Sequence, residues 1–307
     1  MNKLLPCLCL IAFITLSACT KKGSLEMDKK YEFEYTNIEN IEIKGAVFDI
    51  EIDGESRSNV FGTIETSDES HKLYHTQKGK TMEIWYKRPL WKLPFFRKHS
   101  LVLKVPYSTN IKIDNSSGKV NIKSIKTKKV EIKASSGNVL INNIEALVDV
   151  KTSSGSITAS KLLSQNKVSF KTSSGSIKIE DIKADIKIDT TSGKQIYKNI
   201  TGNINANASS GDIYIEFEKG VLELKTTSGK ISGKDITITG NSFFKTTSGN
   251  ISMAFKNSIE NFTFNLRTNS GRLEVGDQRT KNELITGNGK IKIKGESSSG
   301  SQNYNTN

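Results

Sequence analysis

The side chains that could act as nucleophiles in this sequence are paired hydroxyls, which precede glycine in a recurring Ser-Ser-Gly or Thr-Ser-Gly motif. A serine hydroxyl becomes a good nucleophile only beside a general base, most often a histidine. The chain has three histidines, His71, His75 and His99, and all of them precede the first motif, which ends at Gly118. The hydroxyl pairs therefore predict a repeated structural turn, and we expect no catalytic residues among them.

The glycines of this motif recur at intervals of 18 to 22 residues. They are Gly118, Gly137, Gly155, Gly175, Gly193, Gly211, Gly229, Gly249, Gly271 and Gly289. A fixed period of this length is typical of a solenoid, in which each repeat buries its apolar face only by stacking on its neighbours. At each corner the glycine is expected to supply a positive φ without steric cost.

Aligned on the glycine, the repeats have apolar residues five positions before it and two positions after it, such as Ile132 and Val139 around Gly137. Because strand side chains alternate between faces, these columns predict two core-facing strands in each repeat. Gln195 is the one polar residue in the second column, and a one-residue bulge is expected there to bring Ile196 inward. The pattern predicts an all-β, parallel β-solenoid of about ten 18–22-residue coils, right-handed by the usual chirality of parallel crossovers.

The segments around the repeats complete the predicted domain organisation. Residues 31–110 alternate in strand fashion and are expected to form an N-terminal β cap and the first coils. The solenoid repeats span residues 111–294, and the lysines of the last strand, 290–294, are expected to protect an exposed sheet edge. The Ser- and Asn-rich residues 295–307 are predicted to be a disordered tail.

One segment of the cap, residues 86–99 (YKRPLWKLPFFRKH), combines prolines, cations and aromatic rings. Two interpretations are open. Its aromatic side chains fold onto the end of the solenoid as a cap, or they form a surface that contacts a lipid interface or another ligand. The candidate binding residues are Lys87, Arg88, Trp91, Lys92, Phe95, Phe96, Arg97 and Lys98.

Charged residues on outward positions of the repeats form columns instead of one cluster. Lysines four positions before the glycine, such as Lys133 and Lys151, stand near carboxylates two positions earlier, such as Glu131 and Asp149. These neighbours are expected to form exposed ion pairs worth about 0–1 kcal/mol each, and the alternative is a cationic strip for an anionic polymer. Because acids and bases gather in no single coil and GGxGxD repeats are absent, we expect no acid–base catalysis, metal site or cofactor.

The first residues have the order of an export signal, in which a basic residue precedes an apolar run over residues 4–16. The sequence LSAC, residues 16–19, resembles the lipobox of bacterial lipoproteins, where the signal is cut before the cysteine and the cysteine is acylated. This resemblance implies a signal peptide over residues 1–18 and a lipidated tether over residues 19–30, with the lipid on Cys19.

Cleavage of the signal would also remove Cys7 and Cys9, so the sequence predicts no disulfide, zinc site or thiol nucleophile. The net charge of +13 becomes +12 without Lys3. Beside the membrane held through Cys19, such a charge favours an anionic glycan, an envelope polymer or an envelope protein as partner. Export argues against nucleic acid, and the expected location is the periplasmic side of a bacterial membrane or the cell surface.

The Ser-Ser-Gly repeats, the strand 101–106 (LVLKVP) and the lipoprotein signal together resemble the DUF4097-like family of bacterial β-solenoid proteins, which are grouped as candidate adhesins. The resemblance covers residues 31–294 and implies an exported or envelope-associated solenoid with no established catalytic residues. Residues 86–99 are not part of the family pattern. Three functions stay open: a surface-anchored binding or adhesion module, an envelope structural or stress-sensing component acting through a protein partner, and a polysaccharide-cleaving β-helix enzyme.

Overall fold

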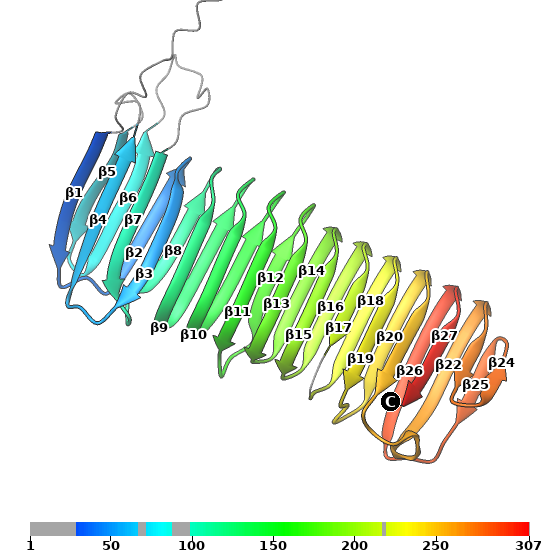
Figure 1. The fold of residues 1–307 in the computed structure, drawn as a ribbon. Coiled ribbons are helices and arrows are strands. Elements are labelled where there is room, and N and C mark those ends of the chain that lie inside the picture. Colours follow the sequence, from blue (N-terminus) through cyan, green and yellow to red (C-terminus); the bar gives the residue numbers. More distant parts are fainter. Residues whose placement is uncertain (1–28, 67–71, 88–98, 217–218, 307) are drawn as a thin grey trace, which may run out of the picture.

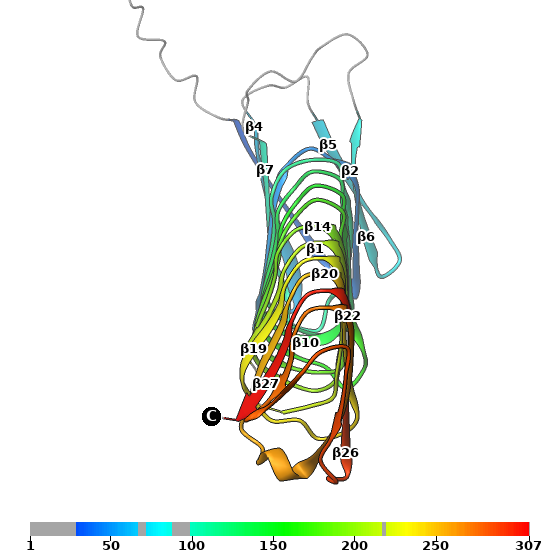
Figure 2. The same cartoon turned by 90° about the vertical axis from the view of Figure 1, so that its right-hand side faces the viewer.

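The computed structural model describes residues 29–66, 72–87, 99–216 and 219–306. These residues form strands, connecting turns and one turn of 3-10 helix, η1 (Ile259–Asn261). The strands stack side by side into a rod, with β1 (Lys29–Thr36) at one end and β25 (Glu283–Thr286) at the other (Figure 1). A view turned by 90° shows two walls of strands joined by rounded turns (Figure 2). The predicted all-β, mostly parallel, solenoid-like architecture is confirmed.

The strands that run toward the corner glycines form one wall, which we call the leading sheet. In spatial order it contains β5 (Lys72–Lys78), β6 (Thr81–Lys87), β2 (Asn40–Ala46), β8 (Asn110–Asn115), the second halves of β9 (Val120–Ala134) and β10 (Val139–Thr152), β12 (Val168–Thr172), β14 (Ile186–Ser192), β16 (Ile204–Ser210), β18 (Leu222–Ser228), β20 (Ser242–Ser248), β26 (Ile291–Ser299), β22 (Phe262–Ser270) and β25.

The strands that leave the corners form the opposite wall, the trailing sheet. It contains β1, β4 (Asn59–Thr66), β7 (His99–Pro106), β3 (Asp49–Glu55), the first halves of β9 and β10, β11 (Ile157–Leu163), β13 (Ile177–Lys183), β15 (Gln195–Thr201), β17 (Ile213–Glu216), β19 (Ile231–Ile236), β21 (Ile251–Phe255), β27 (Gln302–Thr306), β23 (Leu273–Val275) and β24 (Gln278–Thr280). Antiparallel pairs close both ends of the rod.

Each coil places its core side chains directly over those of the next coil. Val139, Ile157 and Ile177 are consecutive partners in the trailing sheet, and all three are fully buried. The two apolar columns predicted from the sequence face each other and form one continuous core along the rod. Because burial of each Val, Ile, Leu or Phe contributes about 1.5–3 kcal/mol, stacking supplies stabilisation that an isolated coil lacks.

The corner glycines are required mainly because neighbouring coils approach closely. A Cβ added to Gly137, Gly155 or Gly175 would lie 1.7–2.0 Å from the carbonyl oxygen of the corner glycine in the preceding coil. None of these three has a positive φ, so the conformational reason predicted for them is wrong, although Gly118 does have a φ of 102°. The Thr172 hydroxyl ties two corners together, since it donates to the Gly155 carbonyl (3.0 Å) and accepts from the Gly175 N–H (3.1 Å).

A second turn, which the sequence analysis did not identify, recurs six residues after the corner glycine. In six coils the residue at this position adopts the left-handed conformation, with φ between 52° and 60°. These residues are Ser124, Asn143, Lys161, Asp181, Asn199 and Asp235. Asn and Asp tolerate this conformation better than most residues, so their enrichment at this position is the signal in the sequence.

The bulge predicted at Gln195 is wrong. Gln195 pairs in unbroken register with Ile177 and Ile213, and its side chain is fully buried while Ile196 faces outward. Its amide donates to the Thr190 hydroxyl (2.7 Å) and to a backbone carbonyl (2.9 Å), and its carbonyl oxygen accepts from the Tyr197 hydroxyl. Burial is tolerated because these hydrogen bonds replace those with water.

The disordered tail predicted over residues 295–307 is also wrong for residues 295–306, which form the end of β26, a corner and β27. β26 lies between β20 and β22, and β27 lies between β21 and β23, in parallel register with both neighbours (Figure 1). The segment is held because Ile293 and Tyr304 are fully buried. The end of the chain therefore fills a position between two earlier coils. Lys292 and Lys294 lie on the interior strand β26, and the predicted protection of an exposed edge by the lysines of residues 290–294 is wrong.

Gly300, and not the predicted Gly289, is the corner glycine of this inserted coil. A Cβ added to Gly300 would lie 1.8 Å from the carbonyl oxygen of Gly249, and one added to Gly271 would lie 2.2 Å from that of Gly300. Gly289 lies instead beside the start of β22, where its N–H donates to the carbonyl of Phe262 (3.1 Å). A Cβ at Gly289 would approach the Phe262 nitrogen to 2.2 Å, so a glycine is needed there for a different close contact.

Two buried tyrosines predict a loss of stability in alkali. Burial raises the pKa of Tyr197 and of Tyr304 above the ordinary value of 10.0. Their contribution to stability is complete below pH 10, and it falls above that pH because the unfolded chain then releases phenolic protons that the folded chain keeps. We expect the melting temperature to drop as the pH rises above about 10, and to drop less steeply in the double variant Tyr197→Phe, Tyr304→Phe. Equal slopes in a scanning calorimeter would contradict this origin.

Candidate functional site

Residues 86–99 take the place of one corner of the solenoid. Strands β6 and β7 are in register with β2 and β3, so that Trp85 pairs with Lys44 and Ser100 pairs with Asp49. In the coil of β2 and β3 the corner consists of residues 45–48, whereas in the neighbouring coil residues 86–99 make the same connection. The segment identified from the sequence is therefore an enlarged corner attached to a regular scaffold.

Both ends of this enlarged corner are fixed on the buried ring of Phe48. The ring centroids of Tyr86 and His99 lie 6.1 Å and 5.1 Å from that of Phe48. The Nδ1 atom of His99 lies 2.7 Å from the Thr66 hydroxyl. The backbone of Phe48 also stacks against the corner glycine of the next coil, since a Cβ on Gly118 would lie 2.4 Å from the Phe48 carbonyl oxygen. Phe48 therefore occupies a corner position. Binding residues are commonly found on loops whose ends are held by a rigid scaffold, and the contacts of Phe48 provide such a scaffold for this loop.

The predicted site residues are placed only in part by the structure. Lys87 is exposed at the end of β6. The other candidate binding residues lie outside the described residues: Arg88, Trp91, Lys92, Phe95, Phe96, Arg97 and Lys98. Cys19 and all residues before Lys29 also lie outside them, so the lipid anchor and the role of the enlarged corner stay predictions.

The enlarged corner begins and ends on the side of the rod where the described chain starts. Lys29 pairs with Thr66, and Thr66 pairs with His99 in the trailing sheet. In the leading sheet, Lys72 pairs with Lys87. Figure 1 shows these strand ends together at the upper end of the cap. Lys29 therefore lies at the same strand ends as the two ends of the enlarged corner.

An exposed aromatic pair near this corner was missed by the sequence analysis. Tyr74 and Trp85 are directly opposite each other in β5 and β6, with 41% and 38% of their surface exposed. Their rings are stacked, with centroids 5.8 Å apart and planes inclined by 17°. The alternation of β6 was the available signal, because the inward positions of Met82 and Ile84 force Trp85 outward.

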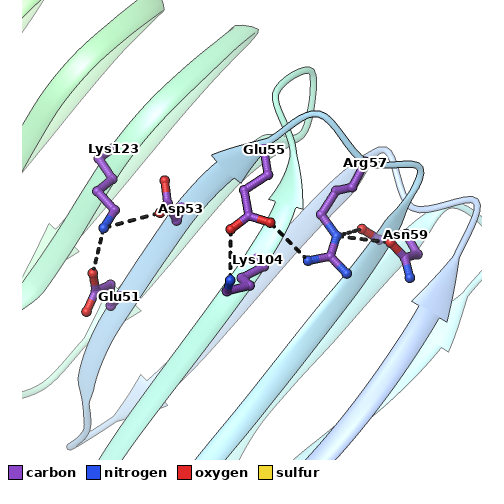
Figure 3. A network of polar contacts seen from close by, with 7 residues as sticks. All are labelled: Glu51, Asp53, Glu55, Arg57, Asn59, Lys104 and Lys123. Atoms are coloured by element: carbon purple, nitrogen blue, oxygen red, sulfur yellow. Dashed lines mark hydrogen bonds and ion pairs between the residues drawn. The ribbon is translucent and has the colours of Figure 1, made fainter.

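Polar contacts cross the outer surface of the trailing sheet near the cap (Figure 3). The Lys123 ammonium lies 3.1 Å from Glu51 and 3.2 Å from Asp53, and its hydrogen bonds to them raise the pKa of Lys123. The hydrogen bond from Lys104, at 3.0 Å, lowers the pKa of the Glu55 carboxyl. Because these carboxylates are paired with cations, the network joins neighbouring strands and is poorly suited to proton transfer.

The charge columns of the leading sheet form the ion pairs predicted from the sequence. Lys151 lies 3.0 Å from Asp149, and Glu131 accepts from Lys129 at 2.7 Å and lies 3.5 Å from Lys133. Among the described residues no group of three or more His, Cys, Asp and Glu side chains could hold a metal ion. These pairs favour a solvated, neutralised face over a continuous cationic strip.

The described histidines are engaged within the cap. His75 Nδ1 lies 2.8 Å from the Tyr35 hydroxyl, and partial burial lowers its pKa. The ring of His75 also stacks on Phe33, with centroids 4.0 Å apart. His99 contacts Thr66 and Phe48. These contacts give both rings a packing role at the N-terminal end of the core.

Removal of the Phe48 ring is expected to loosen the base of the enlarged corner. Phe48→Ala should cost about 3–5 kcal/mol, the usual effect of truncating a buried phenylalanine. Hydrogen exchange should become faster in β3, β6 and β7 and stay unchanged in β15. Tyr107→Ala is the control, because 47% of the Tyr107 surface is exposed. Unchanged exchange at β6 and β7 in Phe48→Ala would show that the ring does not hold these strand ends.

Fold and corner together define a solenoid-type protein that carries an enlarged loop on a rigid β scaffold. The sequence profile described as Toastrack DUF4097 matches residues 38–221 and 218–305. The chain belongs to this family, which confirms the resemblance found in the sequence.

Several solved structures are similar to this chain. A candidate cell adhesion protein of Clostridium sporogenes ATCC 15579 has 10% identity and a TM-score of 0.24, over 91% of this chain and 100% of that one. A candidate adhesin of Bacteroides fragilis NCTC 9343 has 13% identity and a TM-score of 0.44, over 92% and 98%. A candidate lipid binding protein of Parabacteroides distasonis ATCC 8503 has 17% identity and a TM-score of 0.41, over 74% and 96%.

No curated protein matches the chain. Within the described parts of the chain, no helix has the length and apolar character needed to cross a membrane.

Proposed function

We propose that this protein is an exported, lipid-anchored bacterial lipoprotein whose solenoid, right-handed and of about ten coils, is a non-catalytic binding or adhesion scaffold. The observation that carries the proposal is the enlarged corner. A segment rich in cations and aromatic rings replaces a four-residue turn, residues 45–48 in the neighbouring coil, and its ends are fixed on Phe48. Loops held by rigid scaffolds are the usual carriers of binding residues.

The chemistry of the enlarged corner points to an anionic partner. Its eight candidate residues combine cations, which attract acidic groups, with large aromatic surfaces, which contribute much of the binding energy at interfaces. An anionic glycan, an envelope polymer or a lipid headgroup surface has this complementary chemistry. The paired charges elsewhere on the rod support the choice of the corner over the charge columns.

The binding test uses the fragment beginning at residue 24, with and without residues 87–98 replaced by a Gly-Ser loop. We expect saturable, salt-sensitive binding to an anionic glycan, polymer or vesicle that is lost in the replaced variant. Equal binding by both fragments would move the site elsewhere on the rod. An absence of binding to all three classes would favour the second function, an envelope component that acts through a protein partner.

The anchor is tested separately by mass spectrometry of the full chain isolated from a bacterial membrane. We expect a mature N-terminus at Cys19 that carries diacylglycerol, and release of the Cys19→Ser variant from the membrane. Detection of an unmodified Cys19 in the mature protein would overturn the anchor and leave the binding scaffold to be judged by its own test.

A further inference from the structure

We propose that the stacked rings of Tyr74 and Trp85 rest in the headgroup region of the bilayer that anchors Cys19, and that this contact sets the orientation of the rod on the membrane. This inference rests on the lipid anchor proposed above. It assigns a role to two residues of the regular β scaffold, outside the enlarged corner. It also specifies which edge of the cap faces the lipid.

The pair is a flat aromatic surface beside charged outward residues of the leading sheet. Tyr74 and Trp85 are cross-strand partners whose ring planes are nearly parallel, at 17°. The outward residue next to Trp85 in the adjacent strand is Lys44, which is paired with Glu42 at 3.1 Å. Tyrosine and tryptophan join an apolar ring to a polar group, and this combination favours the interface between water and lipid.

The position of the pair on the strands favours the bilayer over a soluble ligand. Trp85 stands two residues before Lys87, the end of β6, so the pair lies about 7 Å from the strand ends at a rise of about 3.3 Å per residue. Lys29, where the described chain begins, lies at the same ends of the strands in the opposite sheet. Lys29, the first described residue, therefore lies at the end of the cap where the pair lies.

The length of the preceding chain keeps this end of the rod close to the membrane. Lys29 lies ten positions after Cys19, and an extended chain spans at most about 3.6 Å per position, or about 36 Å in all. Lys87, exposed beside the pair, adds an attraction to anionic headgroups. A tether alone leaves the rod free to rotate, whereas a second contact at the aromatic pair restricts its orientation.

The test follows Trp85 itself. The chain has two tryptophans, so the Trp91→Phe variant leaves Trp85 as the single tryptophan, whose emission is excited selectively near the red edge of the absorption band. The fragment from residue 24 is mixed with vesicles of phosphatidylcholine and phosphatidylglycerol, and the lipidated full chain is reconstituted in the same vesicles. We expect a blue shift of the emission, protection from iodide, and quenching by lipids brominated near the headgroup. Loss of both rings, in Tyr74→Ser with Trp85→Ser, should weaken vesicle sedimentation of the fragment roughly tenfold or more.

The matched control is Tyr107→Ser, because Tyr107 is also exposed but lies beyond the opposite end of β7. It should bind vesicles like the parent fragment. Continued access of iodide to Trp85 in the lipidated, reconstituted chain would overturn the inference while the anchor stands. Quenching of Trp85 by soluble glycans but not by brominated lipid would overturn it in favour of a sugar-binding surface. Membrane contact by the fragment together with an unmodified Cys19 would support the contact and reject the anchor.

Discussion

Removal of residues 291–307 is expected to unfold the C-terminal end of the rod and to leave the earlier coils folded. β26 and β27 separate the coil of β20 and β21 from that of β22 and β23, so their loss leaves open edges on both sides. The ring of Tyr304 packs against Phe244, Phe255 and Phe264, with centroids 5.6–6.2 Å apart. Because each buried side chain of this kind contributes about 1.5–3 kcal/mol, the missing contacts exceed what the short antiparallel cap can replace.

Hydrogen exchange measured by mass spectrometry distinguishes this local effect from general destabilisation. In the truncated chain we expect β22 to β25 to exchange at the rate of an unfolded segment and β11 to β15 to keep their protection, as nearest-neighbour stacking implies. Gly295→Leu should have a similar effect at full length, since even a Cβ at Gly295 would lie 2.1 Å from the Gln302 side chain. Ile285→Ser, with 63% of Ile285 exposed, should leave protection unchanged. Protection of β22 in the truncated chain would mean that the end coil docks directly on β20.

The sequence predicts the coil register correctly wherever successive repeats are also neighbours in space. Val139, Ile157 and Ile177 occupy the same position in successive repeats, and they are paired with one another in neighbouring strands of the structure. The two orders agree because each of these coils stacks on the one that precedes it in the chain. This rule fails after β21. The coil of β22 and β23 is next in the chain, but the end of the chain lies between it and β21. The period of the repeats in the sequence does not reveal which coils are neighbours in space, because that depends on tertiary packing.

The inserted coil was hidden because its core positions carry unusual residues. Five before and two after its corner stand Gly295 and Gln302, where most coils have aliphatic residues. A signal was nevertheless present. Ser298-Ser299-Gly300 repeats the corner motif, and the pair Gln302 and Tyr304 repeats Gln195 and Tyr197, in which the tyrosine hydroxyl also donates to the glutamine. The prediction of disorder for residues 295–307 was based on their serine-rich composition and did not use this match to the corner motif.

The candidate site was predictable in composition but not in placement. Residues 86–99 stand out in the sequence by their rings and cations. Their position as an enlarged corner depends on the pairing of β2 with both β6 and β8, strands that are far apart in the chain. The contacts of Phe48 with Tyr86 and His99 could not be predicted for the same reason, because only the coiling of the chain brings these residues together.

Gly155→Ala is expected to destabilise the middle of the rod by about 3 kcal/mol or more, the upper range for overpacking in a rigid core. The added Cβ would lie 1.8 Å from the carbonyl oxygen of Gly137 and 2.9 Å from the Thr152 hydroxyl. Gly137 lies in the corner between β9 and β10 and Thr152 ends β10, so relief requires movement of backbone that is held by paired strands. Chemical denaturation followed by circular dichroism should show an earlier transition that begins in the coils around β10 to β12.

Gly79→Ala, in the hairpin turn between β5 and β6, separates the two reasons for which a turn can require glycine. Gly79 has a φ of +59°, and a Cβ there would meet no atom within 4 Å, so this substitution adds conformational strain alone. Its cost should be about 1 kcal/mol. Gly155 has no such φ, and its cost comes from contact alone. If Gly155→Ala proved as mild as Gly79→Ala, the corners would have room to relax, and close stacking of the glycines could not explain why the motif recurs in coil after coil.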